Sequence, residues 1–400
     1  MMLLATLISL AATAQTSPSA PVPAESLPLT LSAPPTATPK ATNSTAEDLL
    51  LIPEDAKLFK ESMLWQHTVS LRTGAGYDDN VLLSPGAPQG SAFATAGLDG
   101  SFSRLPLDGW GVDLVVSGDD VRYLQDVPTG GTDFWLADLT LKRFLGDNWV
   151  AGVETSENYL DEVDYVDALT GPEFLDIQGD ILNIKPFVRR NLGTNWWSEL
   201  DFPAAREVLA APLDNVWKYG PQLQLGFSDD RQQALTLSYQ VQWFDHDDWP
   251  ALSADGLAIG TRTLSLIEQR IDLDWRQYWD DASHWSTDTK LAYVRDEDNG
   301  GDFFNFDEYS ASERLRYRSK NWEWAATVRG GYLDYPVQRT GIISGPTLDE
   351  VLLHATIHGE RRLTGWLKVY AEYNYARVLS NLSDIRYAAN TVTLGLIWEF

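Results

Sequence analysis

The segment at residues 391–400, TVTLGLIWEF, alternates strictly along its length. In a strand, successive side chains point to opposite faces. One face then carries Val392, Leu394, Leu396, Trp398 and Phe400, while the other is mostly small or polar. A half-buried strand of a soluble protein shows the same alternation, so the rest of the chain must decide which environment the apolar face meets.

The composition narrows the class of protein. The 400 residues include 16 Trp, 16 Tyr and 14 Phe, no Cys, and a formal net charge of −27. So acidic a chain is a poor partner for nucleic acid, because phosphate binding needs a basic face. The absence of Cys excludes disulfides and thiolate metal sites.

The first 60 residues differ from the rest. Residues 1–14, MMLLATLISLAATA, form an apolar run ending in a small-residue pattern, which predicts a signal peptide cleaved before Gln15, although no Lys or Arg precedes the run. Residues 15–60 are rich in Pro, Ser, Thr and Ala and predict a disordered periplasmic leader. No other apolar run is long enough for a transmembrane helix.

From residue 61 onward the apolar residues recur with a period of two, which predicts an all-β domain over residues 61–400. About 16 such segments follow one another, most of about 10 to 15 residues, longer than ordinary soluble strands. A tilted strand needs about 9 to 11 residues to cross a bilayer.

The connections alternate in length, which is typical of a barrel with short periplasmic turns and long outer loops. The short ones are 105–109, 145–148, 191–195, 228–232, 279–284, 319–321 and 363–365, and the long ones are 78–90, 119–132, 157–178, 203–216, 244–260, 296–305, 333–347 and 378–386. Six of the short ones are followed closely by Trp, namely Trp110, Trp149, Trp196, Trp285, Trp322 and Trp366. Trp at one height on successive strands indicates a girdle at a membrane interface.

These features and the terminal strand resemble Gram-negative outer-membrane β-barrel proteins of the porin type. The resemblance implies an up-and-down antiparallel transmembrane barrel of about 16 strands in the outer membrane. It also implies outer-membrane lipid, lipopolysaccharide and the barrel-assembly machinery as partners, with Trp398 and Phe400 as the assembly signal. Residues 72–84, RTGAGYDDNVLLS, are similar to the opening strand of barrels linked to exopolysaccharide export or surface-protein assembly.

Some residues do not fit the pattern. Pro186 and Pro221 fall inside expected strands, although Pro has no N–H to donate to a ladder. Gln269, Arg295 and Glu313 fall on the expected lipid face. Either bulges shift the phase there, or these residues lie at interface height.

The face opposite the apolar one carries both signs of charge in nearly equal number. Candidate pore-lining residues are Arg72, Asp113, Asp138, Lys142, Glu268, Arg270, Asp272, Asp274, Arg276, Asp288, Lys290, Arg314, Arg316, Arg329, Lys368 and Glu372. Two interpretations remain open: a transverse field across a pore, or cross-strand ion pairs that stiffen the wall. The excess acid is then expected in outer loops such as YDDN (77–80), SGDD (117–120) and DEDNGGD (296–302).

Metal and enzyme sites are weakly indicated. Asp296, Asp298 and Asp302 alternate like calcium ligands, but without flanking helices or a fifth carboxylate we favour solvated acidity and expect no metal and no cofactor. His354 and His358 share one face of a strand, without a third ligand or a nucleophile that the sequence places beside them. We therefore expect a structural pair rather than an enzyme.

The favoured function is a channel for passive diffusion of small hydrophilic solutes, tilted towards cations. The alternatives are a barrel serving polysaccharide export or surface assembly and, in another class, an outer-membrane enzyme or a plugged structural anchor. The sequence leaves the solute and the oligomeric state open, a homo-oligomer included.

Overall fold

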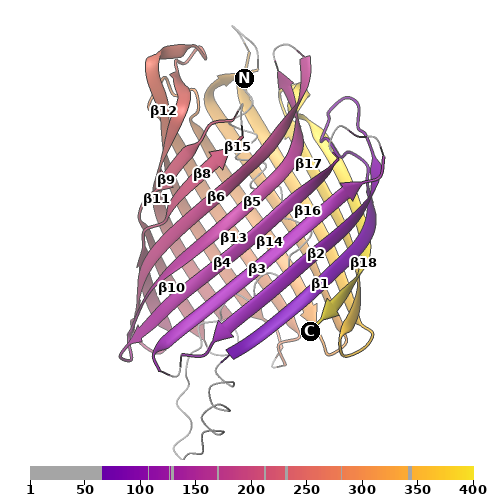
Figure 1. Cartoon of the computed structure of the whole chain (residues 1–400). Helices are drawn as coiled ribbons and strands as arrows, with labels where there is room; N and C mark the ends of the chain where they lie inside the picture. Colours follow the sequence, from indigo (N-terminus) through magenta and orange to yellow (C-terminus); the bar gives the residue numbers. More distant parts are fainter. Residues whose placement is uncertain are drawn as a thin grey trace, which may run out of the picture.

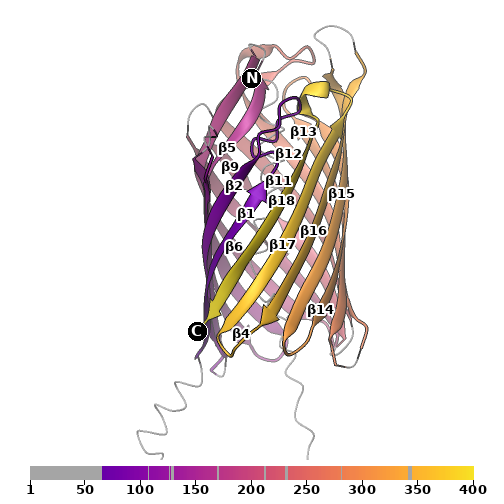
Figure 2. The same cartoon turned by 90° about the vertical axis from the view of Figure 1, so that its right-hand side faces the viewer.

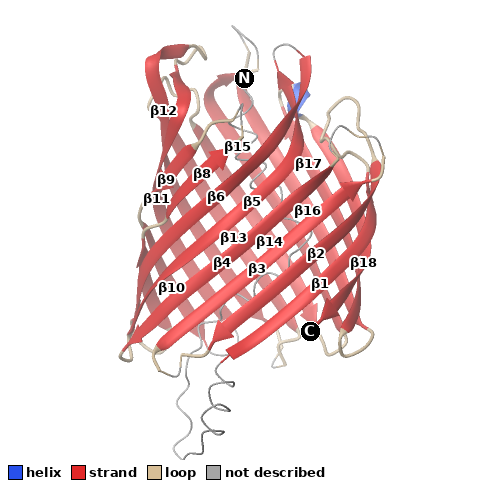
Figure 3. Cartoon of the chain, in the orientation of Figure 1, coloured by secondary structure: helices blue, strands red, loops and turns tan. Residues whose placement is uncertain are grey.

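A computed structural model describes residues 65–400 except 107, 126, 128–129, 169–170, 211–212, 230–232, 281 and 341–344. The predicted signal peptide and leader, residues 1–14 and 15–60, lie outside the described residues. Within the described ranges, no helix is both long and apolar enough to cross a membrane. The only helix described there is the single 3₁₀ turn η1 (Ser383–Ile385), near the end of β17 (Figure 3).

The described chain is a closed antiparallel β-barrel, which confirms the predicted fold class (Figure 1). Its strands are β1 (Trp65–Asp78), β2 (Ser91–Arg104), β3 (Trp110–Tyr123), β4 (Gly131–Leu145), β5 (Trp149–Ala168), β6 (Gly171–Asn191), β7 (Trp196–Asp201), β8 (Ala204–Leu209), β9 (Val216–Tyr219), β10 (Gln222–Asp229), β11 (Gln233–Leu252), β12 (Ala258–Tyr278), β13 (Trp285–Asp298), β14 (Phe306–Arg318), β15 (Trp322–Arg339), β16 (Thr347–Arg362), β17 (Leu367–Ser380) and β18 (Tyr387–Glu399). Each pairs with its neighbours in chain order, and β18 returns to pair with β1.

The eighteen labelled strands make sixteen barrel strands, because β7–β8 and β9–β10 are each one strand interrupted at a proline. Pro203 follows β7, and Pro221 precedes β10. The register against β6 and β11 is the same on both sides of the interruptions. The carbonyls of Pro186 and Pro203 still accept bonds from Phe202 and Gly220, both at 3.1 Å. The prolines thus remove donors without shifting the phase, so the alternative of a bulge does not apply at these positions.

The barrel closes between its first and last described strands, where β1 and β18 lie side by side in Figure 2. Nine residue pairs form this seam, from Ser70 opposite Glu399 to Asp78 opposite Thr391. The amide of Phe400 continues it by donating to the Val69 carbonyl at 2.8 Å. Closure removes the free edge that an open sheet would present.

The YDDN segment after β1 holds the outer end of the seam. Asp79 accepts from the backbone and the side-chain amide of Asn390, both at 2.7 Å. Asn80, 1% exposed, donates to the carbonyls of Ser84 and Ala388 at 3.1 and 3.0 Å. These contacts give the motif a structural role, namely tying the first connection to the last strand.

Glycines in the strands make room for aromatic rings that lie flat on the wall. Trp197 covers Gly226, and a Cβ placed there would lie 2.0 Å from the indole. Tyr370 covers both Gly395 and Gly74, on either side of the seam. A larger residue at these glycines would displace the ring, so the glycine–aromatic pairs determine where these rings lie on the inner surface.

The short turns gather at one end of the barrel, the end at which the C-terminus lies (Figure 1). In the 105–109 turn Arg104 binds Asp108 at 2.8 Å, and this hydrogen bond holds the pKa of that carboxyl below its usual value. The six predicted tryptophans all lie at this end, five as the first residue of a strand and Trp366 just before β17. Guanidinium groups stack on three of these rings, Arg143 over Trp110 at 4.8 Å, Arg190 over Trp149 at 5.2 Å and Arg361 over Trp322 at 5.1 Å.

At the other end, several predicted loops are extended hairpins instead. Residues 157–178 mostly belong to β5 and β6, which stay paired to Ala168 opposite Gly171, and residues 244–260 mostly belong to β11 and β12. The acidic SGDD segment lies inside β3. Bulges occur here, beyond Asp245 in β11 and beyond Asp334 in β15. Strands that outrun the bilayer continue to pair in water, and composition alone does not mark where the membrane ends.

The polar residues expected on the lipid face lie in regular register. Gln269 pairs with Arg295, and Thr289 pairs with Glu313, without a bulge between β12 and β14. Each polar group has a partner on that surface: the Tyr239 hydroxyl donates to Gln269 at 3.2 Å, Arg295 meets Glu297 at 2.8 Å, and the Thr289 hydroxyl donates to Glu313. Local pairing, and not a phase shift, accounts for these residues.

Removal of Phe400 should impair assembly far more than it impairs the barrels that do assemble. The deletion removes the amide that bonds to Val69 and an aromatic ring that is 72% exposed on the outer face. The assembled fraction is measured as the heat-modifiable band on a mild-detergent gel, and conductance is measured per assembled barrel. Phe400→Tyr, which keeps the ring, is the matched control. Wild-type assembly of the deletion variant would contradict this role.

Candidate functional site: the charged inner wall

The two faces of the barrel differ in burial. Side chains converge on the concave face of a closed sheet and diverge on the convex face. Glu199, Asp201 and Glu372 are all less than 10% exposed, whereas Leu200 and Leu394, on the opposite face, are 58% and 61% exposed. The polar face is therefore the inner wall, and the apolar face is the outer belt. In β18 the inner wall takes Thr393 and the outer belt takes Leu394, as the alternation in residues 391–400 predicts.

All sixteen residues predicted to line a pore lie on the inner wall. The register connects them strand by strand: Arg72 faces Gly97 and Ile397, and Asp288 faces both Arg276 and Arg314. The same registers place Asp138, Asp274, Lys290 and Arg329 on this face. The faces follow from strict alternation within the barrel, since no register shift occurs between these residues.

Most of these charges are paired within the wall. Lys142 meets Asp113 at 2.6 Å, Lys185 meets Glu154 at 2.9 Å, and Arg189 meets Glu199 at 2.7 Å. On the opposite arc of strands, Arg270 meets Asp272 at 2.9 Å, Arg276 meets Asp288, and Arg316 meets Glu323. Such pairs span neighbouring strands or neighbouring positions, so this geometry favours the interpretation of wall-stiffening ion pairs over a field across the lumen.

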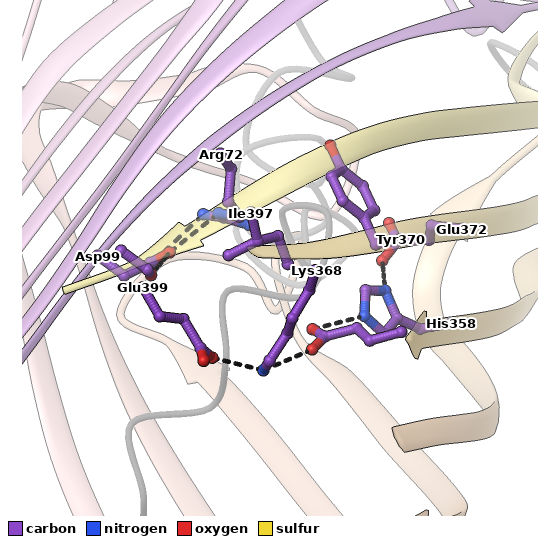
Figure 4. Close-up of a pocket in the computed structure, with 10 residues that line it drawn as sticks. Arg72, Asp99, His358, Lys368, Tyr370, Glu372, Ile397 and Glu399 are labelled. Carbon is purple, nitrogen blue, oxygen red and sulfur yellow. Dashed lines mark hydrogen bonds and ion pairs between the residues drawn. The ribbon is translucent and has the colours of Figure 1, made fainter. Parts of the chain in front are cut away.

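A pocket straddles the seam on the inner wall (Figure 4). It draws His358 and Glu360 from β16, Lys368, Tyr370 and Glu372 from β17, Ile397 and Glu399 from β18, Ser70 and Arg72 from β1, and Asp99 from β2. Lys368 Nζ lies 2.9 Å from Glu360 Oε2 and 2.5 Å from Glu399 Oε1. On the far side of the seam, Arg72 Nε lies 2.9 Å from Asp99 Oδ2, and its Nη2 lies 3.0 Å from Asp119. Ion pairs thus lie on both sides of the seam, among β16, β17 and β18 on one side and among β1, β2 and β3 on the other.

Four members of this network are not among the sixteen pore-lining candidates. Asp119 was placed in an outer loop, although it lies inside β3 on the inner wall. Asp99, Glu360 and Glu399 lie on strands whose alternation predicts an inward side chain. The parity of the strand could have found them, but their partners depend on how the barrel closes.

The two inward histidines do not form a metal pair. His358 Nδ1 lies 2.8 Å from Glu372, and its Nε2 lies 3.1 Å from Glu360. His354 faces Arg329 and Ala376 across its neighbouring strands. In the part of the chain that the structure describes, no group of three His, Asp or Glu residues is arranged to hold a metal ion.

The weak calcium candidates are also separated. Asp296 lies on the inner wall opposite Glu268. Asp298 instead closes its own loop, because its carboxylate accepts from the amides of Gly300, Asp302 and Phe304 at 2.7 to 3.0 Å. This carboxylate shapes the turn that follows β13.

No family model matches the chain, and neither does any curated protein. Similar solved structures include the outer membrane channel DcaP of Acinetobacter baumannii, with 14% identity over 84% of this chain and 97% of that chain and a TM-score of 0.48. An anion-selective porin from Comamonas acidovorans has 10% identity over 84% and 99%, with a TM-score of 0.46. A bacterial polysaccharide outer membrane secretin has 12% identity over 83% and 98%, with a TM-score of 0.40.

The chain's own strand pairing defines its class. A closed antiparallel barrel with an apolar outer belt, a tryptophan girdle and a charged inner wall is the architecture of the Gram-negative outer-membrane β-barrel proteins. The described chain has this architecture.

Lys368→Met should destabilise the barrel by about 1 to 3 kcal/mol, because it removes the cation that Glu360 and Glu399 share, while His358 and Arg362 stay beside them. Denaturant-induced unfolding in detergent micelles measures the change. Lys320→Met, at an exposed position in the 319–321 turn, is the matched control and should change stability by less than about 0.5 kcal/mol. Equal stability of the two variants would contradict the network's role at the seam.

Proposed function

We propose that this barrel is an outer-membrane channel of the porin type, through which small hydrophilic solutes diffuse passively, with a preference for cations. The observation that carries the proposal is a closed barrel of sixteen strands whose inner face is charged on every arc. Barrels of about 16 strands are wide enough to leave an aqueous channel. A charged inner wall stays hydrated, since burying unpaired charge away from water is unfavourable.

The cation preference rests on the balance of charge along the wall. Basic side chains are largely engaged by acids, as in Lys142 with Asp113 and Arg270 with Asp272. The whole chain carries a net charge of −27, so acid is in excess. Acidic side chains near the outer mouth, Asp245 and Asp298 among them, enrich cations locally.

The proposal assigns no catalytic group and no cofactor. Its partners are those that a barrel of this class requires: outer-membrane lipid and lipopolysaccharide, and the assembly machinery acting on Trp398 and Phe400. Polysaccharide export, surface assembly and structural anchoring are the functions that remain if the barrel does not conduct.

Purified protein in a planar bilayer should give steady open-channel current, and a KCl gradient should give a reversal potential of the sign expected for cations. The preference should weaken between about 0.1 and 1 M KCl, because the screening length falls from about 10 to about 3 Å. The absence of current across the bilayer would refute the channel proposal. Steady current with anion preference would overturn only the selectivity.

A further inference from the structure

Three carboxylates converge on the inner wall between β12 and β14, towards the outer mouth. Glu268 on β12 lies directly opposite Asp296 on β13. Glu308 on β14 faces Val294, one inward position from Asp296. The carboxylates of Glu268 and Glu308 both lie close enough to Asp296 to repel it electrostatically. We call these three residues the acidic trio.

The central member of the acidic trio is buried without a full set of partners. Asp296 is 6% exposed, and its Oδ1 has no hydrogen-bond partner among the described residues. Leaving a buried carboxylate oxygen unsatisfied is unfavourable, more so beside two further carboxylates. Asp296 Oδ1 is therefore an acceptor that a positively charged donor would satisfy.

The nearest basic groups are engaged elsewhere. Arg270 Nε lies 2.9 Å from both oxygens of Asp272. Lys218 Nζ lies 2.8 Å from Glu207 and over the ring of Phe244. These two bases therefore form their short ion pairs with other acids, and Asp296 Oδ1 has no hydrogen-bond partner among the described residues.

The surroundings indicate the kind of cation. Among the described residues, no group of three His, Asp or Glu side chains, the trio included, is arranged to hold a metal ion. Ammonium and guanidinium groups carry several donors and reach carboxylates that are further apart. Phe306 lies directly opposite Asp296, and its ring is 5.7 Å from that of Tyr335.

An apolar cluster continues from these rings. Tyr335 belongs to a buried cluster with Leu333, Leu348 and Val378, against which Phe306 packs. Phe306 itself is only partly buried and lies opposite Asp296, so its ring is the apolar group that a carbon frame attached to the cation would meet, and an aromatic face also attracts an organic cation.

We propose that the acidic trio is a binding site for organic cations that bear ammonium or guanidinium groups on a short carbon chain. A role of this site in permeation rests on the proposed channel function, whereas the binding of the cation does not.

Titration calorimetry of the detergent-solubilised barrel with spermidine measures this binding directly. Wild type should bind, and Asp296→Asn should bind at least about tenfold more weakly, as expected for losing one charge-assisted contact of about 1.4 kcal/mol or more. Glu297→Gln is the matched control. It removes an acid from the neighbouring position of the same strand, on the outer face, and should bind as wild type.

Heat-modifiable migration shows that each variant is folded. Equal affinity of wild type and Asp296→Asn, or no binding by wild type, would overturn the inference. Binding of Mg²⁺ with the same dependence on Asp296 and greater affinity than spermidine would assign the site to metal ions instead.

Bilayer recordings separate this inference from the channel proposal. Spermidine should block the potassium current through wild type at lower concentration than through Asp296→Asn. Spermidine binding that depends on Asp296 in a barrel without current would support the site and refute the channel. Current through a barrel that does not bind spermidine would support the channel and refute the binding site.

Discussion

The requirement that every backbone N–H and C=O within the bilayer be paired governs this structure. An unsatisfied backbone group in hydrocarbon is strongly unfavourable, so a sheet that spans a membrane has to close on itself. Here the closure is made by β1 and β18, the first and last described strands of the chain. Three sets of contacts lie at or beside this strand pair. They are the hydrogen bonds of the YDDN segment at the outer end, the ring of Tyr370 over Gly395 and Gly74, and the ion pairs of Lys368 and Arg72.

Closure also explains how charge is distributed on the inner wall. Side chains that converge on a concave surface lose water to one another, and a charge there needs a partner close by. Cross-strand pairs such as Lys185 with Glu154 meet that need through short reaches between neighbours. Asp296 differs from these paired acids, because one of its carboxylate oxygens has no hydrogen-bond partner among the described residues. This difference is the basis of the proposed cation site.

Alternation made the two faces predictable. The period-two pattern assigned inner and outer residues over the described barrel, because the bulges in its strand pairs are confined to the outer ends of two hairpins. The same local pattern could not locate where strands stop. The sequence predicts loops at Asp119 and at the acids of residues 296–302, whereas β3 and β13 extend through Asp119 and Asp298. Paired backbone continues into water, and side-chain chemistry at that level is polar on both faces.

The sequence did not identify side-chain partners that lie two strands apart or across the seam. The meeting of Arg72 with Asp119, two strands away, depends on barrel curvature, and the role of Asp79 depends on which residue of β18 lies opposite. The effect of the prolines was left open for a related reason. A lost donor is compatible with a bulge or with a regular strand, and here the neighbouring strands hold the register through Pro203 and Pro221 without a shift.

Disulfide cross-linking of the seam tests the closed barrel most directly, because the natural chain has no Cys. Ala75 and Leu394 are opposite each other on the outer belt. Hydrogen-bonded pairs of this kind have Cα atoms about 5.5 Å apart, within disulfide reach. The double variant Ala75→Cys with Leu394→Cys should cross-link efficiently in detergent. Ala75→Cys with Leu396→Cys, whose second position lies on the same face but opposite Thr73, should not. Equal cross-linking of both pairs, or none of the first, would contradict the register on which the account depends.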